Sequence, residues 1–266
     1  MTYVYAVARA TDGLEEFSAS LEGVAGAPVR LVPDSHGTLA FVVSHVPAED
    51  FQEEALKRHL EDLDWLEAIA RAHHGVVEAL AMHTTLLPLR LATVYLDDAR
   101  ARDVLDAGRA QFAQRLARLV DHVEWGVKIY VEPSAAPAAP EPSRMADLTP
   151  GRSYLRDRRH QRSLRDSVYQ AAQQAAETIE AAGRRLATER ACHRVQQGAL
   201  AGPSGENVVN DAYLVPRENC EEFRAEVTHA ADGLQGVRVE VTGPWAPYSF
   251  VLSPAETDDA STGTGP

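Results

Sequence analysis

Two apolar segments frame the stretch that decides the fold: Leu86-Leu87-Pro88-Leu89-Arg90-Leu91-Ala92-Thr93-Val94-Tyr95 and Val123-Glu124-Trp125-Gly126-Val127-Lys128-Ile129-Tyr130-Val131. In the second segment every other residue from Val123 to Val131 is apolar, and polar residues lie between them. This alternation is typical of a strand with one buried and one solvent-exposed face. Asp97 and Asp98 suit the start of an intervening helix, because acidic residues cap and stabilise helix N-termini. The stretch predicts a strand, a helix and a second strand in one unit.

The residues before this stretch complete a first domain. Thr2 to Arg9 is strand-like, and Val29 to Pro33 with Thr38 to Val46 predicts a hairpin whose turn is Asp34-Ser35-His36-Gly37. Apolar residues at helical spacing from Ala48 to Met82 predict one long helix. Several strands with two helices on one face indicate an α+β fold, a ferredoxin-like α/β sandwich over residues 1–132.

A change of composition separates this domain from a second one. Residues 133–148 are rich in proline and alanine, which predicts a semi-rigid linker. Thr149-Pro150 predicts the start of a long helix reaching about Gln197. A strand over Val208 to Val215, a helix from Pro216 and a strand from Val237 follow, so residues 149–252 are expected to form an α+β domain with a long helix and a βαβ unit. Residues 253–266 have no apolar pattern and are expected to be disordered.

Charge and cysteine content exclude several classes of protein. The chain has 266 residues, 26 basic and 39 acidic, with a formal net charge of −13. This acidic balance argues against nucleic acid or an anionic membrane surface as the main partner. Two distant cysteines, Cys192 and Cys220, suggest cytosolic thiols without a structural disulfide. No basic signal segment and no apolar run of spanning length is present, so we expect a soluble, cytoplasmic protein.

The sequence lacks the common catalytic signatures. It has no Walker loop, no dinucleotide-binding glycine fingerprint, no His-Glu-x-x-His and no Gly-x-Ser-x-Gly. Asp34, Ser35 and His36 adjoin on a turn and cannot point at one another as a catalytic triad must. A histidine group is the best metal candidate, with Glu78 one turn after His74; its other members are His59, His73 and His83. Structural roles for these histidines are the simpler interpretation, so we expect no enzyme, no cofactor and no metal.

Arg90 and the arginines of the long helix each allow alternative interpretations of their role. Arg90 lies inside an apolar segment and is expected either to form a buried ion pair, for instance with Glu124, or to face solvent or bind an anion. The first turns of the long helix are strongly basic, and this face either balances an acidic protein or docks acidic groups. Its arginines are Arg152, Arg156, Arg158, Arg159, Arg162 and Arg165.

Several of these segments together resemble the gas vesicle GvpF/GvpL family. They are His74-x-x-Val77-x-x-Leu80, Leu87-Pro88-Leu89-Arg90-Leu91-x-Thr93-Val94, Glu124 to Tyr130, Asp211 to Val215, and Gly243-Pro244-Trp245-Ala246-Pro247-Tyr248-Ser249-Phe250. Gly151-Arg152-Ser153-Tyr154-Leu155 is similar to the family's Gly–Tyr–Leu segment with one extra residue before the tyrosine. The resemblance covers most of residues 2–252. It implies a non-enzymatic accessory or minor structural protein of gas vesicle assembly, located at the gas vesicle in the cytoplasm.

The resemblance also implies partners, namely the hydrophobic shell protein and other gas vesicle accessory proteins. We hypothesise that five residues contact them: Tyr3, Tyr5, Tyr130, Arg90 and Trp245. The three tyrosines would form a shallow patch on the first domain, and residues 1–132 alone would bind the shell protein. Trp245 is expected either to close the second domain's core over Val239 and Val241 or to remain exposed as a partner anchor. A small-molecule-binding enzyme on a ferredoxin-like scaffold is the alternative function.

Overall fold

The chain folds into two compact units, and the second is inserted into the first. The computed structural model describes residues 1–132, 150–195 and 205–251. Unit 1 comprises Met1–Val123 together with the segment from Trp245 onward, and unit 2 comprises Glu124–Pro244. The expected division at residue 132 is therefore displaced to residue 123, and the chain returns to unit 1 at its end. The expected linker, the Thr149 cap and the expected disordered tail lie outside the described residues.

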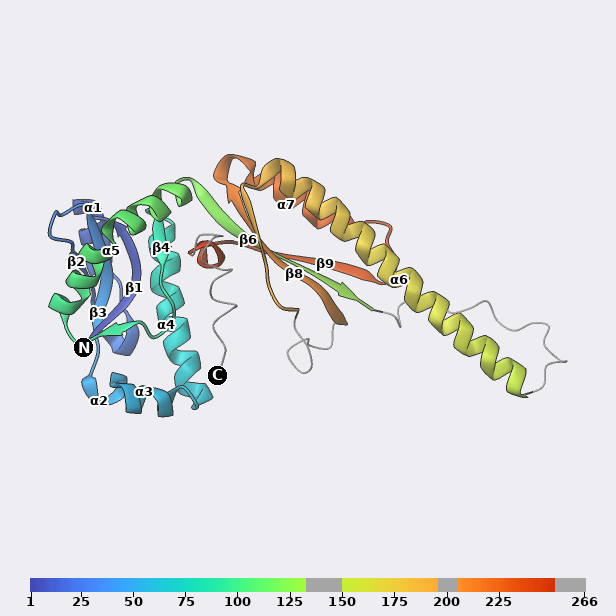
Figure 1. Ribbon diagram of the computed structural model, residues 1–266, viewed down its shortest axis with the longest axis horizontal. Helices are drawn as coiled ribbons and strands as arrows, with labels where there is room; N and C mark the ends of the chain where they lie inside the picture. Colours follow the sequence, from blue (N-terminus) through green and yellow to red (C-terminus); the bar gives the residue numbers. More distant parts are fainter. Residues whose placement is uncertain (133–149, 196–204, 252–266) are drawn as a thin grey trace. The chain divides into compact units, whose positions relative to one another are not determined.

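Unit 1 is built on an antiparallel sheet (Figure 1). Its strands are β1 (Thr2–Arg9), β2 (Val29–Pro33), β3 (Leu39–His45) and β4 (Leu86–Pro88), in the order β2-β3-β1-β4, with β5 (Val94–Tyr95) also pairing with β1. Helix α1 (Asp12–Ala19) links β1 to β2, and α4 (Leu63–Ala81) precedes β4. This is the βαββαβ order of a ferredoxin-like fold; the sequence predicted this fold class but not helix α1.

Helices cover both faces of this sheet, not one face as expected. A register shift between Val4 and Ala6 lets Tyr3, Tyr5, Ala6 and Ala8 share one face, where they pack with residues of α1 and α4. On the other face the Phe41 ring lies 5.9 Å from Phe112 of α5 (Asp98–Leu119). Strand β1 is buried from Thr2 to Ala8 for this reason.

Two elements expected to be continuous are interrupted. The helix predicted over residues 48–82 is three helices, α2 (Ala48–Phe51), α3 (Glu53–His59) and α4. Gln52 has an extended backbone, and the Asp62 side chain caps α4 by accepting from the amides of Asp64 and Trp65. The strand predicted over 86–95 breaks at a turn where Thr93 donates to the carbonyl of Arg90.

Unit 2 repeats the same topology. Its strands are β6 (His122–Val131), β7 (Glu189–Cys192), β8 (Glu206–Pro216) and β9 (Val237–Trp245), in the order β7-β8-β6-β9. Helix α6 (Pro150–Leu186) follows β6, and α7 (Cys220–Thr228) follows β8. Strand β6 thus begins the second sheet, and the segments 86–95 and 123–131 belong to different sheets. The predicted strand–helix–strand unit is wrong in this respect, because alternation identifies a strand's faces but not its partners.

Helix α6 ends earlier than the sequence predicted. It stops at Leu186, whose carbonyl accepts from the Asn219 side chain, and β7 follows where helix had been expected to continue to Gln197. Short 3-10 turns complete the chain at Val24–Gly26, Arg217–Asn219, His229–Ala231 and Tyr248–Phe250. Within the described ranges, no helix is long and apolar enough to cross a membrane.

Candidate functional site

The two N-terminal tyrosines belong to the core of unit 1, not to its surface. Tyr3 and Tyr5 are fully buried, with ring centroids 5.0 Å apart. The Tyr5 hydroxyl lies 2.6 Å from Ser44 Oγ and accepts from the Val24 amide at 2.7 Å, and burial raises its pKa. The expected surface patch of Tyr3, Tyr5 and Tyr130 is therefore wrong, because α1 and α4 cover the face that carries Tyr3 and Tyr5.

Tyr3 is linked to a buried histidine of α4. Its hydroxyl lies 3.0 Å from His73 Nδ1 and accepts from the Ala92 amide at 3.1 Å. Since the amide supplies one hydrogen to the oxygen, the hydroxyl hydrogen is available for Nδ1. Burial lowers the pKa of His73 to about 4, and the Leu89 carbonyl offsets this only in part. His73 is consequently a neutral core residue at pH 7.

The C-terminal return segment, Trp245–Val251, packs onto unit 1. Ala246 belongs to the same core as Tyr3 and Tyr5, Phe250 is buried, and the Phe250 carbonyl accepts from Arg118 Nη2 at 2.7 Å. Trp245 itself is 37% exposed, and its ring centroid lies 5.7 Å from that of His74 on α4. The prediction that Trp245 closes the second domain's core is therefore wrong; the structure leaves the alternative, a tryptophan presented at the surface.

The two remaining predicted contact residues have different environments. Arg90 is exposed in the turn after β4 and forms no ion pair among the described residues, so the expected buried pair with Glu124 is wrong. Tyr130 is buried in unit 2, where the Arg238 guanidinium lies 4.2 Å above its ring. The structure thus places Tyr3, Tyr5, Arg90 and Trp245 in unit 1 and Tyr130 in unit 2, and it exposes only Arg90 and Trp245.

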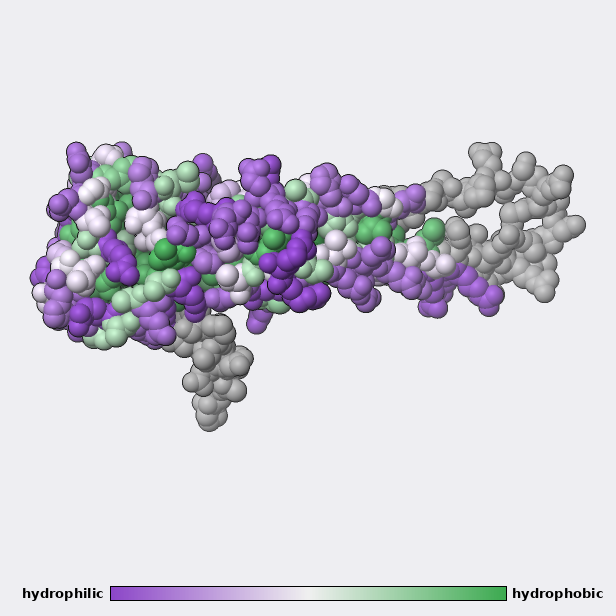
Figure 2. All heavy atoms as spheres, turned by 90° about the horizontal axis from the view of Figure 1, so that it is seen from above, coloured by the Kyte–Doolittle hydropathy of each residue, from purple (hydrophilic) through white to green (hydrophobic). Residues whose placement is uncertain are grey.

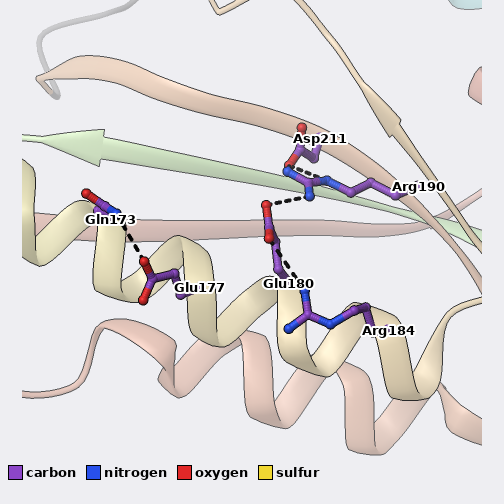
Figure 3. Close-up of polar contacts among 6 residues, drawn as sticks. All are labelled: Gln173, Glu177, Glu180, Arg184, Arg190 and Asp211. Atoms are coloured by element: carbon purple, nitrogen blue, oxygen red, sulfur yellow. Dashed lines mark hydrogen bonds and ion pairs between the residues drawn. The ribbon is translucent and has the colours of Figure 1, made fainter.

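Unit 2 contains a polar cluster that the sequence did not predict (Figure 3). Arg190 on β7 bridges Asp211, at 2.7 Å, and Glu180 of α6, at 2.6 Å; Glu180 also pairs with Arg184. Burial alone would lower the pKa of Arg190, but the bonds to these carboxylates raise it above its ordinary value. A cleft of about 250 Å³ lies beside the cluster between α6 and β7, with the ring of the buried Tyr213 in its lining. Because the two arginines and two carboxylates pair with one another, the cluster holds β7 against α6.

The histidines that were candidates for a metal site have structural roles. His59 stacks on Trp65 at 5.0 Å and His83 on Phe17 at 3.8 Å, while His74 lies 3.7 Å from Glu78. Over the described ranges, the His, Cys, Asp and Glu side chains form no group of three that could hold a metal ion.

Asp34 accepts from the amides of Thr38 and Leu39, which identifies a turn. Burial alone would raise the pKa of Asp34, but these hydrogen bonds hold it below its ordinary value.

Comparison with known proteins places this architecture in a family. The family model described as gas vesicle synthesis protein GvpL/GvpF matches residues 1–252. The chain is 46% identical to gas vesicle protein L of Streptomyces sp. (strain CB03234), over 94% of this chain and 92% of that protein. It is 28% identical to gas vesicle protein F of the same strain, over 94% and 99%.

Solved structures show the same fold. Crystal structures of GvpF from Anabaena sp. PCC7120 and from Microcystis aeruginosa each superpose with a TM-score of 0.62 at 19% identity. They cover 95% of this chain, and 96% and 99% of their own. The match in sequence along 1–252 and the shared mixed helix and sheet architecture agree: this chain belongs to the gas vesicle GvpL/GvpF family.

Proposed function

We propose that this chain supports gas vesicle assembly without catalysis, by binding the hydrophobic shell protein, and that Trp245 is the anchor of that contact. The observation that carries the proposal is the exposed Trp245 ring on a segment whose following residues are buried. Aromatic residues held on rigid backbone are the usual hot spots of protein interfaces, because little conformational entropy is lost when they bind. A very hydrophobic partner requires such apolar contact area to stay soluble before it joins the vesicle wall.

The surroundings of Trp245 suit a contact surface. Its ring lies against His74, and spacings of four residues place Glu78 on the same face of α4 and the exposed Met82, the residue that caps the end of α4, next along that face. Methionine adapts its shape to varied apolar partners. We infer that this face also contacts other gas vesicle accessory proteins in the cytoplasm. Arg90 then lies at the periphery of the contact, and the buried tyrosines stabilise the fold.

The test is co-expression of the shell protein with the full chain and with its Trp245→Ala variant. We expect the full chain to co-purify with soluble shell protein that survives a high-salt wash, because the contact is apolar. Trp245→Ala should lose roughly 2 kcal/mol of binding free energy, while its melting temperature changes little because the ring is partly exposed.

A matched control separates this contact from general surface hydrophobicity. Val195 is also 37% exposed but lies in unit 2. Val195→Ala should leave capture of the shell protein unchanged. Capture that survives Trp245→Ala, or that high salt removes, would show that Trp245 is not the anchor.

A further inference from the structure

The first half of α6 is a basic helix whose described side chains before Val168 are exposed, apart from the half-buried Leu164. Val168 is the first described side chain of α6 that is buried, beside Gly236, and Tyr169 reaches Glu206 at the first residue of β8. Residues 150–167, which we name the basic arm, therefore run past the end of the sheet of unit 2 (Figure 1). At 1.5 Å per residue the arm is about 27 Å long.

The basic arm presents a concentrated positive charge. It contains six arginines and two aspartates in a chain whose net charge is −13. Arg158, Arg159 and Arg162 are exposed and form no ion pair within the part of the chain that the structure describes. Figure 2 shows the described portion of this helix as predominantly hydrophilic. An isolated helix of this length is marginal in water, so a partner that neutralises its charge would also stabilise it.

Unit 1 carries a surface of the opposite charge. Residues 48–67, which we name the acidic corner, span α2, α3 and the start of α4 and contain eight carboxylates against two basic residues. Glu54, Glu61 and Asp64 are exposed and form no ion pair among the described residues. Between them Leu60 is 40% and Leu63 is 77% exposed. Two exposed leucines rimmed by carboxylates match the general composition of a docking surface, an apolar centre with a charged rim.

We propose that the basic arm of one copy of this chain docks on the acidic corner of a second copy. The complementary charges, present on every copy at the same concentration, favour this partner over nucleic acid, which the remaining acidic surface would repel. The arm has too few apolar residues to lie in a membrane surface. Because the arm and the corner are different surfaces, the contact is heterologous, so copies join head to tail into a ring or an open filament.

Sedimentation of the full chain at low and high salt (about 0.05 M and 0.5 M) tests the proposal. We expect concentration-dependent association at low salt that high salt reverses. The arm variant, Arg158→Glu with Arg159→Glu and Arg162→Glu, and the corner variant, Glu54→Lys with Glu61→Lys and Asp64→Lys, should each associate at least tenfold more weakly. Mixing the two variants, or combining all six changes in one chain, should restore association, since the charges are then complementary again.

A charge-matched control distinguishes local contact from net charge. Arg9→Glu with Arg100→Glu and Arg109→Glu makes the same change in net charge at exposed positions of unit 1 and should associate like the wild type. A wild type that stays monomeric at all concentrations, a mixture that fails to restore association, or a control that behaves like the arm variant would overturn the proposal. So would nucleic acid that co-purifies with the wild type and is lost from the arm variant while the oligomeric state is unchanged.

Discussion

At the scale of single residues, burial decides what each aromatic side chain does. Tyr3 and Tyr5 alternate with Val4 as residues of an edge strand would, but β1 lies inside the sheet and is covered on both faces. Trp245 is the opposite case: it is the last residue of β9, yet the chain leaves unit 2 there and the ring is exposed. Neighbouring strands and covering helices set these outcomes, and neither is visible in a short sequence window.

His73 makes the stability of unit 1 depend on pH. Its folded pKa, about 4, lies below its ordinary value of 6.5, so between these values the unfolded chain binds a proton that the folded chain does not. Stability is therefore full above pH 6.5 and falls as the pH drops towards 4, by up to about 3 kcal/mol. We expect His73→Asn, which keeps an acceptor near Tyr3, to flatten this slope in urea unfolding at pH 7 and pH 4.5. His74→Asn is the matched control, and an equal slope in wild type and His73→Asn would contradict the assignment.

At the scale of elements, the sequence predicted most strands of unit 1 and its ferredoxin-like fold class, but not helix α1 or the cover on both faces of the sheet. Residues 2–9, 29–33 and 208–215 form strands as expected, because alternation and turn residues report local structure directly. The sheet membership of β6 and the end of α6 could not be predicted. The first depends on pairing with β8 and β9 over long sequence separations, and the second on the pairing of β7 with β8. The expected patch of Tyr3 and Tyr5 is wrong for a related reason, since their burial depends on α1 and α4 covering β1, which is also a contact between segments distant in the sequence.

Helix packing predicts opposite effects for two similar substitutions. Gly75 in α4 has open space where a Cβ would lie, whereas a Cβ on Gly183 in α6 would lie 2.4 Å from the ring of the buried Tyr213. We expect Gly75→Ala to raise the free energy of unfolding by about 0.5–1 kcal/mol, because alanine favours helix. Gly183→Ala should lower it by roughly 1–3 kcal/mol through overpacking. Chemical denaturation of both variants measures the difference, and a stabilising Gly183→Ala would show that Tyr213 moves freely aside.

At the scale of the whole molecule, a ferredoxin-like unit is interrupted by a second unit of the same topology. The insertion begins at Glu124 and ends at Pro244, and its two ends adjoin, since a Cβ on Gly243 would lie 2.8 Å from the Glu124 carbonyl. Adjacent ends are what allow a domain to be inserted without disturbing its host. The return segment then completes the host core with Ala246 and the partly buried Tyr248. A fragment chosen by sequence position alone, such as residues 1–132, lacks the end of unit 1 and carries the start of unit 2.

This arrangement predicts which fragment of unit 1 folds. Residues 1–132 retain β6 without its sheet and lack the return segment, so Val127, Ile129 and Val131 lose their cover and the fragment should aggregate. Residues 1–123 joined to 245–252 by about three glycines should be monomeric and unfold cooperatively. Residues 1–123 alone should be less stable by about 3–5 kcal/mol, because Ala246 and the Tyr248 ring are lost from the core. Circular dichroism and urea denaturation of the three fragments provide the measurement. A folded, monomeric fragment 1–132 together with an unfolded joined fragment would mean that β6 belongs to unit 1. If the joined fragment folds, it is the correct protein with which to test whether unit 1 alone binds the shell protein.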